Sequence, residues 1–236
     1  MAEIKSFFYK LFDTVDYDIR LLYYYIKVFS RLALRGKGAY IGFPSLINNP
    51  AEVYLHPYSR LQGYHKIING TGKFVLKEYS GVSLNLLVVT GNHTPTVGIP
   101  QFLLAPSHIN DVEKDVIVEE DVWIGANVTL LSGAHLGRGA IVGAMSLVNS
   151  DIPPYAVVVG TPAKIIGVKF SIPQILAHEE KLYAADKRFS VGYLNDIFEK
   201  YYVGKKVLGT DAPLTASQEV ELDKTISLLK FEYQNR

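Results

Sequence analysis

The chain has 236 residues and a net charge of +1, so its charge gives no reason to expect a nucleic-acid partner. It contains no cysteine, which excludes disulfides, thiolate metal sites and cysteine nucleophiles, and which fits a reducing compartment. Hydrophobic residues make up 48% of the chain, enough for a substantial core.

The N-terminal residues 1–36 are expected to be helical, because apolar residues recur there at spacings of three or four. Two helices with a break near Asp16–Asp18 fit this pattern as well as one. The segment could cap the fold, or it could lie on a membrane surface, which Tyr23–Tyr25 would suit and the aspartates would oppose. Charged residues interrupt every apolar run, so neither a secretory signal nor a spanning helix is expected. The expected location is cytoplasmic, with peripheral membrane contact through residues 1–36 as an alternative.

A six-residue repeat dominates the middle of the chain. Every sixth residue from Val112 to Val148 is Ile, Leu or Val, and four positions after each of them, from residue 122 on, stands a mostly small or β-branched residue. A helix of period 3.6 cannot keep such a column on one face, and a strand of 40 residues is implausible. Short strands separated by turns satisfy both columns. The repeat therefore predicts a triangular coil of about 18 residues, with successive coils stacked about 4.8 Å apart.

The same period is present upstream in Ile41–Val53 and Leu76–Val88, whereas Pro57–Lys73 is degenerate. Between Val88 and Val112, glycines and prolines break the strand order. We expect residues 92–111 to form a loop that projects from the coil, which is a favoured place for functional residues.

The run Val122–Lys164 (VWIGANVTLLSGAHLGRGAIVGAMSLVNSDIPPYAVVVGTPAK) resembles the hexapeptide-repeat acyltransferases. It is most similar to the acetyl-CoA-dependent branch that contains maltose, galactoside and polysaccharide O-acetyltransferases. The resemblance extends over residues 38–168. It implies a mainly β fold, a left-handed parallel β-helix, and a homotrimer that binds the cofactor between neighbouring subunits. The left hand comes from the family, since the usual crossover rule favours the right hand.

With residues 38–168 taken as the acyltransferase domain, residues 1–37 are expected to form a helical N-terminal segment. Residues 169–236 are expected to form a helical C-terminal appendage. Gln174–Lys187 and Ser217–Lys230 have helical composition. Thr215 and Gln218 have the spacing of a capping box at the start of the last helix.

His93, in the sequence TGNHTP, is the candidate catalytic base. Acetyl transfer from a thioester to a hydroxyl needs a base with a near-neutral pKa, and the family places a histidine on such a loop. Asn92 could orient His93, hold the acceptor or only form a turn. His108 could line the acceptor pocket. His56 and His65 could also reach the acceptor. His135 and His178 are expected at the surface. No metal is expected, because the two histidines five positions apart that mark β-helical carbonic anhydrases are absent.

The cofactor positions follow from the resemblance. Trp123 matches a tryptophan near the acyl-thioester, Ala126 and Ala144 match positions whose backbone binds pantetheine, and Lys164 matches a basic position near the CoA phosphates. Asn149 is counted with them, although Asn149-Ser150 replaces a common Thr-Lys pair.

Two further departures stand out. Met145 stands where glycine is common and could narrow the cofactor groove, and Gly167 stands where arginine is frequent. Phosphate contacts could instead shift to Lys169 or Arg138.

The expected function is acetyl-CoA-dependent O-acetylation of a saccharide hydroxyl on a surface polysaccharide or oligosaccharide precursor. The hydroxyl would attack the thioester directly, with His93 as base, because no cysteine or nucleophile elbow is present for a covalent intermediate. The alternatives are N-acetylation of a nucleotide-linked amino sugar and a non-catalytic β-helix scaffold. The departures at Met145, Asn149 and Gly167 motivate the scaffold, and His93 and Trp123 oppose it.

Overall fold

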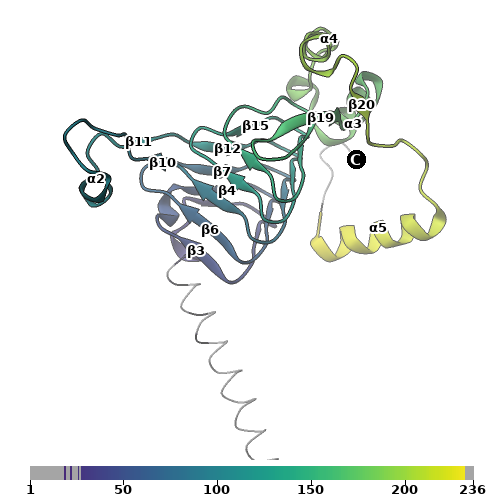
Figure 1. Cartoon of the computed structure of the whole chain (residues 1–236). Coiled ribbons are helices and arrows are strands. Elements are labelled where there is room, and N and C mark those ends of the chain that lie inside the picture. The colour runs from purple at the N-terminus through teal and green to yellow at the C-terminus, as the bar shows by residue number, and fades with distance from the viewer. Residues whose placement is uncertain (1–18, 20–21, 23–25, 27, 232–236) are drawn as a thin grey trace, which may run out of the picture.

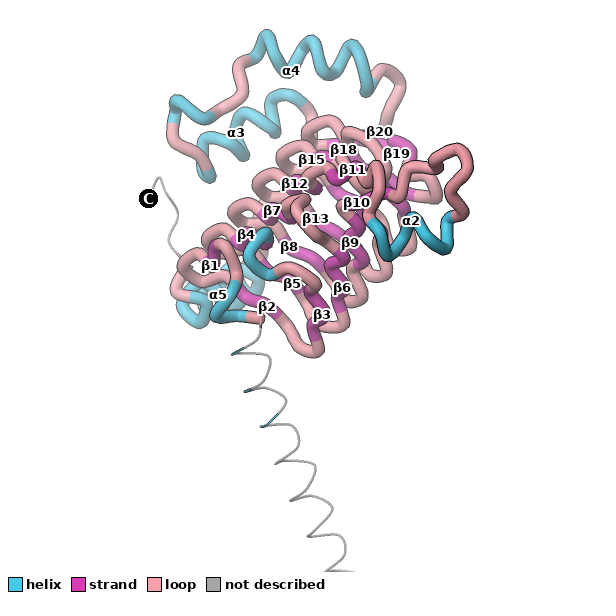
Figure 2. The backbone as a smooth tube through the Cα atoms, turned by 90° about the vertical axis from the view of Figure 1, so that its left-hand side faces the viewer, coloured by secondary structure: helices cyan, strands magenta, loops and turns pink. Residues whose placement is uncertain are grey.

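A computed structural model describes residues 19, 22, 26 and 28–231. Three sheets of short parallel strands run along a triangular coil (Figures 1 and 2). Sheet A contains β1 (Leu34–Arg35), β4 (Val53–Leu55), β7 (Phe74–Leu76), β12 (Val116–Val118) and β15 (His135–Leu136). Sheet B begins with β2 (Tyr40–Ile41), β5 (Arg60–Leu61), β8 (Gly81–Val82), β13 (Trp123–Ile124) and β16 (Ile141–Val142). Sheet C contains β3 (Ser45–Ile47), β6 (His65–Ile68), β9 (Leu87–Val89), β14 (Thr129–Leu130) and β17 (Leu147–Val148).

The coil length changes along the chain. In sheet B, Trp123 pairs with Ile141, eighteen positions later, as the repeat predicts. In the earlier coils, Tyr40 pairs with Arg60 and Arg60 with Gly81, at separations of twenty and twenty-one residues. The extra residues lie at the corners. They obscure the period in the region that looks degenerate in the sequence, although that region forms regular strands.

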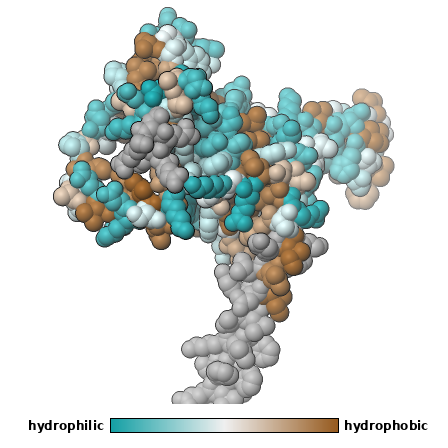
Figure 3. Space-filling view, turned by 180° about the vertical axis from the view of Figure 1, so that it is seen from behind, coloured by the Kyte–Doolittle hydropathy of each residue, from teal (hydrophilic) through white to brown (hydrophobic). Residues whose placement is uncertain are grey.

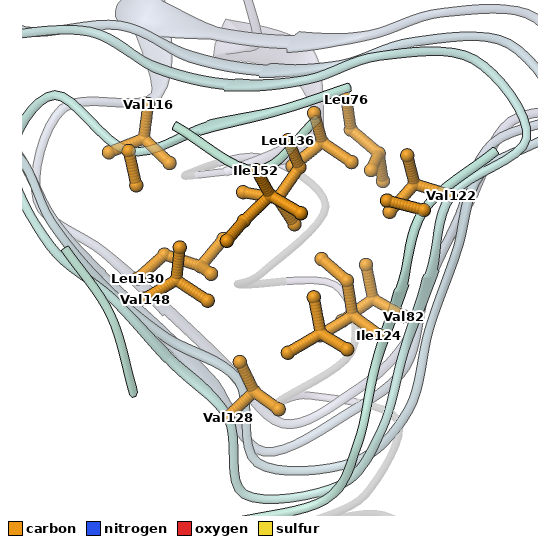
Figure 4. Packing of buried hydrophobic residues seen from close by; sticks show 14 of the residues in the cluster. Leu76, Val82, Val116, Val122, Ile124, Val128, Leu130, Leu136, Val148 and Ile152 are labelled. Atoms are coloured by element: carbon orange, nitrogen blue, oxygen red, sulfur yellow. The ribbon is translucent and has the colours of Figure 1, made fainter. Parts of the chain in front are cut away.

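The two repeat columns form the core of the coil. Figure 4 shows aliphatic side chains from the three sides pointing into the triangle, stacked coil upon coil. The aliphatic column is buried from Val118 to Val148, and so is the small-residue column from Val122 to Ile152. Val112 is the exception, with 48% of its surface exposed, because it belongs to the base of the projecting loop rather than to a coil.

Two corners of the coil place non-glycine residues in the left-handed backbone region, and one of them bears on Met145. Between sheets B and C, Tyr64, Asn85, Asn127 and Met145 have φ values of 62°, 61°, 57° and 62°. Asparagine tolerates this conformation better than most residues, and Asn85 Nδ2 donates to Asn127 Oδ1 at 3.1 Å. Met145 continues this corner column with an exposed apolar side chain.

The predicted loop leaves and re-enters the coil through a short antiparallel pair. β10 (Gly91–Asn92) pairs with β11 (Val112–Glu113), so that Asn92 lies opposite Val112. Beyond this pair the loop extends away from the coil and carries helix α2 (Gln101–Ser107) (Figure 1).

The chain closes the coil after β17. β18 (Ala156–Val159) pairs parallel to β16 and antiparallel to β19 (Lys164–Val168), which in turn pairs with β20 (Lys206–Val207). Three helices follow the coil: α3 (Ile172–Leu182), α4 (Val191–Ile197) and α5 (Ala216–Leu229). Thr215 and Gln218 form the predicted capping box of α5. Short helical turns occupy Phe29–Arg31, Pro50–Glu52, Ala185–Lys187 and Phe198–Tyr202.

Helix α3 is attached to the coil by buried polar contacts. The Glu179 side chain is 1% exposed and accepts hydrogen bonds from Arg138, Tyr155 and the backbone of Phe189. His178 was expected at the surface; its side chain is 26% exposed, and its Nε2 lies 3.0 Å from Asp121 Oδ2. This histidine joins the helix to a coil corner.

Most of the predicted N-terminal helix lies outside the described residues, and its last residues form a short helical turn and strand β1 instead. The coil begins at β1, a few residues before position 38, at which the sequence places its start. Among the described residues, no helix combines the length and the apolar character that crossing a membrane would need.

Candidate active site

A cavity of about 350 Å³ lies where the projecting loop meets the corner between sheets C and A. Strands β6 and β9 contribute apolar walls, and the base of the loop contributes polar side chains. The lining residues are Asn48, Ile68, Asn69, Gly70, Val89, Gly91, Asn92, His93, His108, Asp111 and Glu113.

Two histidines share one carboxylate in this cavity. His93 Nδ1 lies 2.8 Å from Asp111 Oδ1, and His108 Nδ1 lies 2.8 Å from Asp111 Oδ2. A carboxylate only accepts hydrogen bonds, so each Nδ1 carries the proton that it donates. The Nε2 atom of a neutral His93 is then unprotonated and can accept a proton. The His93 side chain is 44% exposed, so substrate can reach it.

Hydrogen bonds from His93 and then His108 lower the pKa of Asp111 below its ordinary value. The side chain is therefore a carboxylate at neutral pH. Its negative charge lies against the Nδ1 atoms of both imidazoles.

The backbone at the end of α2 brings His108 and Asp111 back toward His93. His108 follows the helix with φ 53°, and Asn110 has φ 55°. Asn110 Nδ2 also donates to Thr96 Oγ1 at 3.1 Å, which ties the two arms of the loop together.

Glu113 anchors the loop to the coil below it. Its carboxylate accepts hydrogen bonds from the backbone of Gly70 and Gly72 and from the hydroxyl of Thr90. Burial alone would raise the pKa of Glu113, but the N–H donors, Gly72 foremost, outweigh it and the pKa is lowered. Because three segments converge on one ionised carboxylate, the base of the loop has a defined position.

The sequence did not single out Asp111 or Glu113. Asp111, rather than Asn92, holds the His93 ring. Asn92 lines the same cavity with an exposed side chain, which leaves it available to an acceptor. The signal that could have identified Asp111 is topological, because a loop that leaves and re-enters one coil brings residues 92 and 112 side by side.

The other candidate histidines lie elsewhere. His65 is 1% exposed and is held between Ser45 Oγ and the carbonyl of Gln62, so it cannot reach an acceptor. His56 pairs with Glu78, and His135 with Glu119, as an exposed pair on sheet A.

None of the five predicted cofactor residues lines the His93 cavity. Trp123 lies on the outer face of sheet B, 52% exposed, with its ring over Gly81, where a Cβ would lie 3.1 Å from the ring carbons. Ala126 and Ala144 meet at the corner between sheets B and C, where Met145 N donates to the Ala126 carbonyl. Asn149 and Lys164 are exposed beyond β17 and on β19.

The structure corrects the predicted replacements for the missing phosphate partners. Lys169 Nζ lies 2.6 Å from Asp121 Oδ2, and Arg138 is held by Glu120 and Glu179, so neither side chain is available for phosphate. Gly167 is buried under β20. A Cβ there would lie 2.9 Å from the Lys206 carbonyl, so an arginine would displace that strand.

Comparison with known proteins identifies the repeat. Residues 115–150 match the family model described as bacterial transferase hexapeptide (six repeats). This segment overlaps the run on which the sequence resemblance rests, and the predicted resemblance to hexapeptide-repeat transferases is confirmed.

A curated relative from Staphylococcus aureus (strain JH9), 2,3,4,5-tetrahydropyridine-2,6-dicarboxylate N-acetyltransferase, is 57% identical over 51 residues. The match covers 22% of this chain and 21% of the relative. The chain therefore spans about a fifth of the length of the curated relatives that it matches.

The fold is also similar to that of a hexapeptide-repeat-containing acetyltransferase from Vibrio cholerae. The TM-score is 0.54 at 21% identity, over 60% of this chain and 77% of that one. The same Vibrio cholerae protein in complex with acetyl coenzyme A gives a TM-score of 0.54 at 20% identity, over 60% and 74% of the chains. The shared feature is the parallel β-helical fold.

Proposed function

We propose that this protein is an acetyl-CoA-dependent O-acetyltransferase that acts on a saccharide hydroxyl. The observation that carries the proposal is the His93 side chain, which is fixed through Nδ1 by Asp111 and lines an open cavity. The matched repeat and the acetyl-CoA complex of the Vibrio cholerae protein support the choice of donor.

In the proposed mechanism, Nε2 of His93 takes the proton of the acceptor hydroxyl as its oxygen attacks the thioester carbonyl. The imidazolium so formed keeps its Nδ1–H bond to Asp111, whose charge stabilises it. When the tetrahedral intermediate collapses, the carbon–sulfur bond breaks and the imidazolium returns its proton to the CoA thiolate. General base catalysis of this kind contributes roughly 10²- to 10⁴-fold, and bringing donor and acceptor together contributes much of the rest.

The donor site in this proposal lies between two subunits of a homotrimer. In one chain, the His93 cavity is on the corner between sheets C and A, whereas Trp123 is on sheet B, so one subunit alone does not bring them together. The loop also presents exposed apolar side chains at its tip, seen as the brown patch on the arm in Figure 3: Val97, Phe102, Leu103 and Ile109. A second copy of the chain would cover them and supply Trp123, Ala126, Ala144, Asn149 and Lys164.

The charge of the cavity favours a neutral acceptor. Among the described residues that line it, none is lysine or arginine, whereas Asp111 and Glu113 contribute carboxylates. A sugar nucleotide carries a diphosphate, which such a surface repels. The alternative, N-acetylation of a nucleotide-linked amino sugar, therefore ranks second, although the Staphylococcus aureus relative is an N-acetyltransferase.

The family resemblance supports the rest of the proposal. It takes residues 38–168 as the acyltransferase domain, wound in the left-handed sense. The helical segments at 1–37 and 169–236 rest instead on apolar spacing and composition, and strand β1 at Leu34–Arg35 shortens the first of them. The proposed cytoplasmic location rests on the interrupted apolar runs. The saccharide is taken to be a precursor of a surface polysaccharide or oligosaccharide.

The first test is calorimetric titration with CoA and acetyl-CoA, which needs no knowledge of the acceptor. Micromolar binding would support the donor site despite the missing phosphate partners. The absence of binding would favour the non-catalytic scaffold. Because the chain has no cysteine, release of CoA thiol can then be followed against a panel of neutral sugars and nucleotide-linked amino sugars without a protein background.

The second test replaces the base. His93→Ala should lower turnover by at least about 100-fold and leave CoA affinity nearly unchanged, as expected for loss of a general base. His135→Ala is the matched control, since His135 is also an exposed histidine paired with one carboxylate, but outside the cavity. Near wild-type turnover in His93→Ala would contradict the assignment of His93 as the general base.

A further inference from the structure

We propose that His93, His108 and Asp111 form a binding site for a divalent transition-metal ion such as Zn²⁺, and that metal binding there switches off the base. The site itself follows from the geometry of the loop. Its effect on turnover rests on the proposed function.

Three potential ligands converge at the base of the loop. One ligand atom from each of the two imidazoles and the carboxylate lies within 4.8 Å of the others. Two histidines and a carboxylate are a ligand set that zinc and other first-row metals accept. Zinc bound at about 2.0–2.1 Å to each would need ligand atoms about 3.3 Å apart in tetrahedral geometry. The two imidazoles now contact different oxygens of Asp111, each at 2.8 Å, so the carboxylate would have to turn to offer one oxygen to the ion.

The surroundings favour a cation. The described lining contains two carboxylates and no lysine or arginine. Glu113 accepts several N–H and O–H donors, which leaves Asp111 as the carboxylate that can turn toward an ion. The exposed fractions of 44% for His93 and 72% for His108 give an ion direct access from solvent.

Besides His56 with Glu78, two further histidine–carboxylate pairs in the described part of the chain have a different composition. His135 with Glu119 and His178 with Asp121 each contain one histidine, and a lysine also contacts the carboxylate. A cation already neutralises those carboxylates. They offer matched controls, because they share the pairing without the second imidazole.

Binding of the metal through Nδ1 of His93 has a defined chemical consequence. Neutral His93 carries its proton on Nδ1 while Asp111 accepts it. When the metal takes the Nδ1 lone pair of the neutral ring, the proton moves from Nδ1 to Nε2. Nε2–H has no lone pair with which to accept the proton of an acceptor hydroxyl. The bound ion therefore blocks the base without entering the acceptor part of the cavity.

The test is calorimetric titration of the full chain, prepared without a histidine tag, with zinc chloride alone. We expect one ion per chain. His108→Ala and Asp111→Asn should each weaken binding by at least about tenfold, whereas His135→Ala should leave it unchanged. His108 is exposed, so its truncation leaves the core intact, and unchanged thermal unfolding of each variant would verify folding. Binding that is unaffected in His108→Ala, equally weakened in His135→Ala or absent in the wild type would overturn the site.

Activity gives a separate readout. Zinc should inhibit thiol release by the wild type, a chelator should restore it, and the ratio of turnover without and with zinc should fall in His108→Ala. Zinc binding without inhibition would overturn the switch but not the site. If zinc binds as expected and no acetyl transfer is found, the proposed function fails while the site stands. If turnover depends on His93 but zinc does not bind, the metal site fails while the proposed function stands.

Discussion

Asp111→Asn tests whether the carboxylate positions the base. In the described structure the 2.8 Å bond to Asp111 is the one hydrogen bond that fixes the His93 ring. Without it, the ring can occupy about three χ1 wells and two χ2 orientations, so the productive population falls about sixfold. Asparagine can accept only one of the two Nδ1–H donors with its oxygen, which disturbs the tautomer of one histidine. With the loss of the charge that stabilises the imidazolium, we expect kcat to fall about 10- to 100-fold, less than for removal of the base itself.

The assay is steady-state thiol release, with kcat and the KM for acetyl-CoA measured separately. The KM should change little, since Asp111 does not contact the donor residues. Glu119→Gln is the matched control, because Glu119 holds His135 at 2.9 Å in the same way outside the cavity. Full turnover in Asp111→Asn, or an equal loss in Glu119→Gln, would refute the positioning role.

Leu136→Ala, which removes a fully buried side chain from the aliphatic column, should lower the free energy of unfolding by about 2–5 kcal/mol in denaturant titration; a loss below about 1 kcal/mol would show that the column is not the core. Met145→Asn should raise it by about 0.5–1 kcal/mol, because asparagine suits φ 62° and would continue the column of Asn85 and Asn127; a lower melting temperature would contradict this. Burial alone would raise the pKa of Asp121, but His178 and then Lys169 outweigh it and the pKa is lowered. Asp121 therefore stabilises the fold above its unfolded pKa, and this contribution fades as the pH falls through the lower folded pKa. Asp121→Asn should cost about 1–3 kcal/mol at neutral pH and progressively less in acid, and a pH-independent difference between the two unfolding curves would count against the ion pairs.

The regular coils could be predicted from the sequence because the environment of their side chains repeats with a fixed period. Each inward position of an eighteen-residue coil meets the same environment, so the residue type recurs and is visible without a structure. The earlier coils are twenty or twenty-one residues long and place aliphatic residues at the same inward positions. The extra corner residues obscure this recurrence in the sequence, and they are tolerated because lengthening a surface loop costs little free energy.

The site was harder to predict, because its residues come from the non-repeating loop. The context of His93 was recognisable, but its partners His108 and Asp111 lie fifteen and eighteen positions away, on the far arm of a loop that no single helix or strand spans. A search for paired histidines at a fixed spacing missed them, since the antiparallel pair of β10 and β11, rather than local sequence, brings them together. The ion pair of His178 could not be predicted for the same reason, as its partner Asp121 lies on a corner distant in the sequence.

The insertion between β9 and β12 does not change how the strands of the coil pair with one another. Leu87 pairs with Thr129 in the same register in which Thr129 pairs with Leu147, although the first interval is 42 residues and the second is 18. Twenty-four residues can thus enter the chain without shifting any strand. Under the proposed function, the loop between Thr90 and Glu113 can therefore be exchanged as a cassette, so that acceptor preference diverges while the proposed donor-binding coil stays the same.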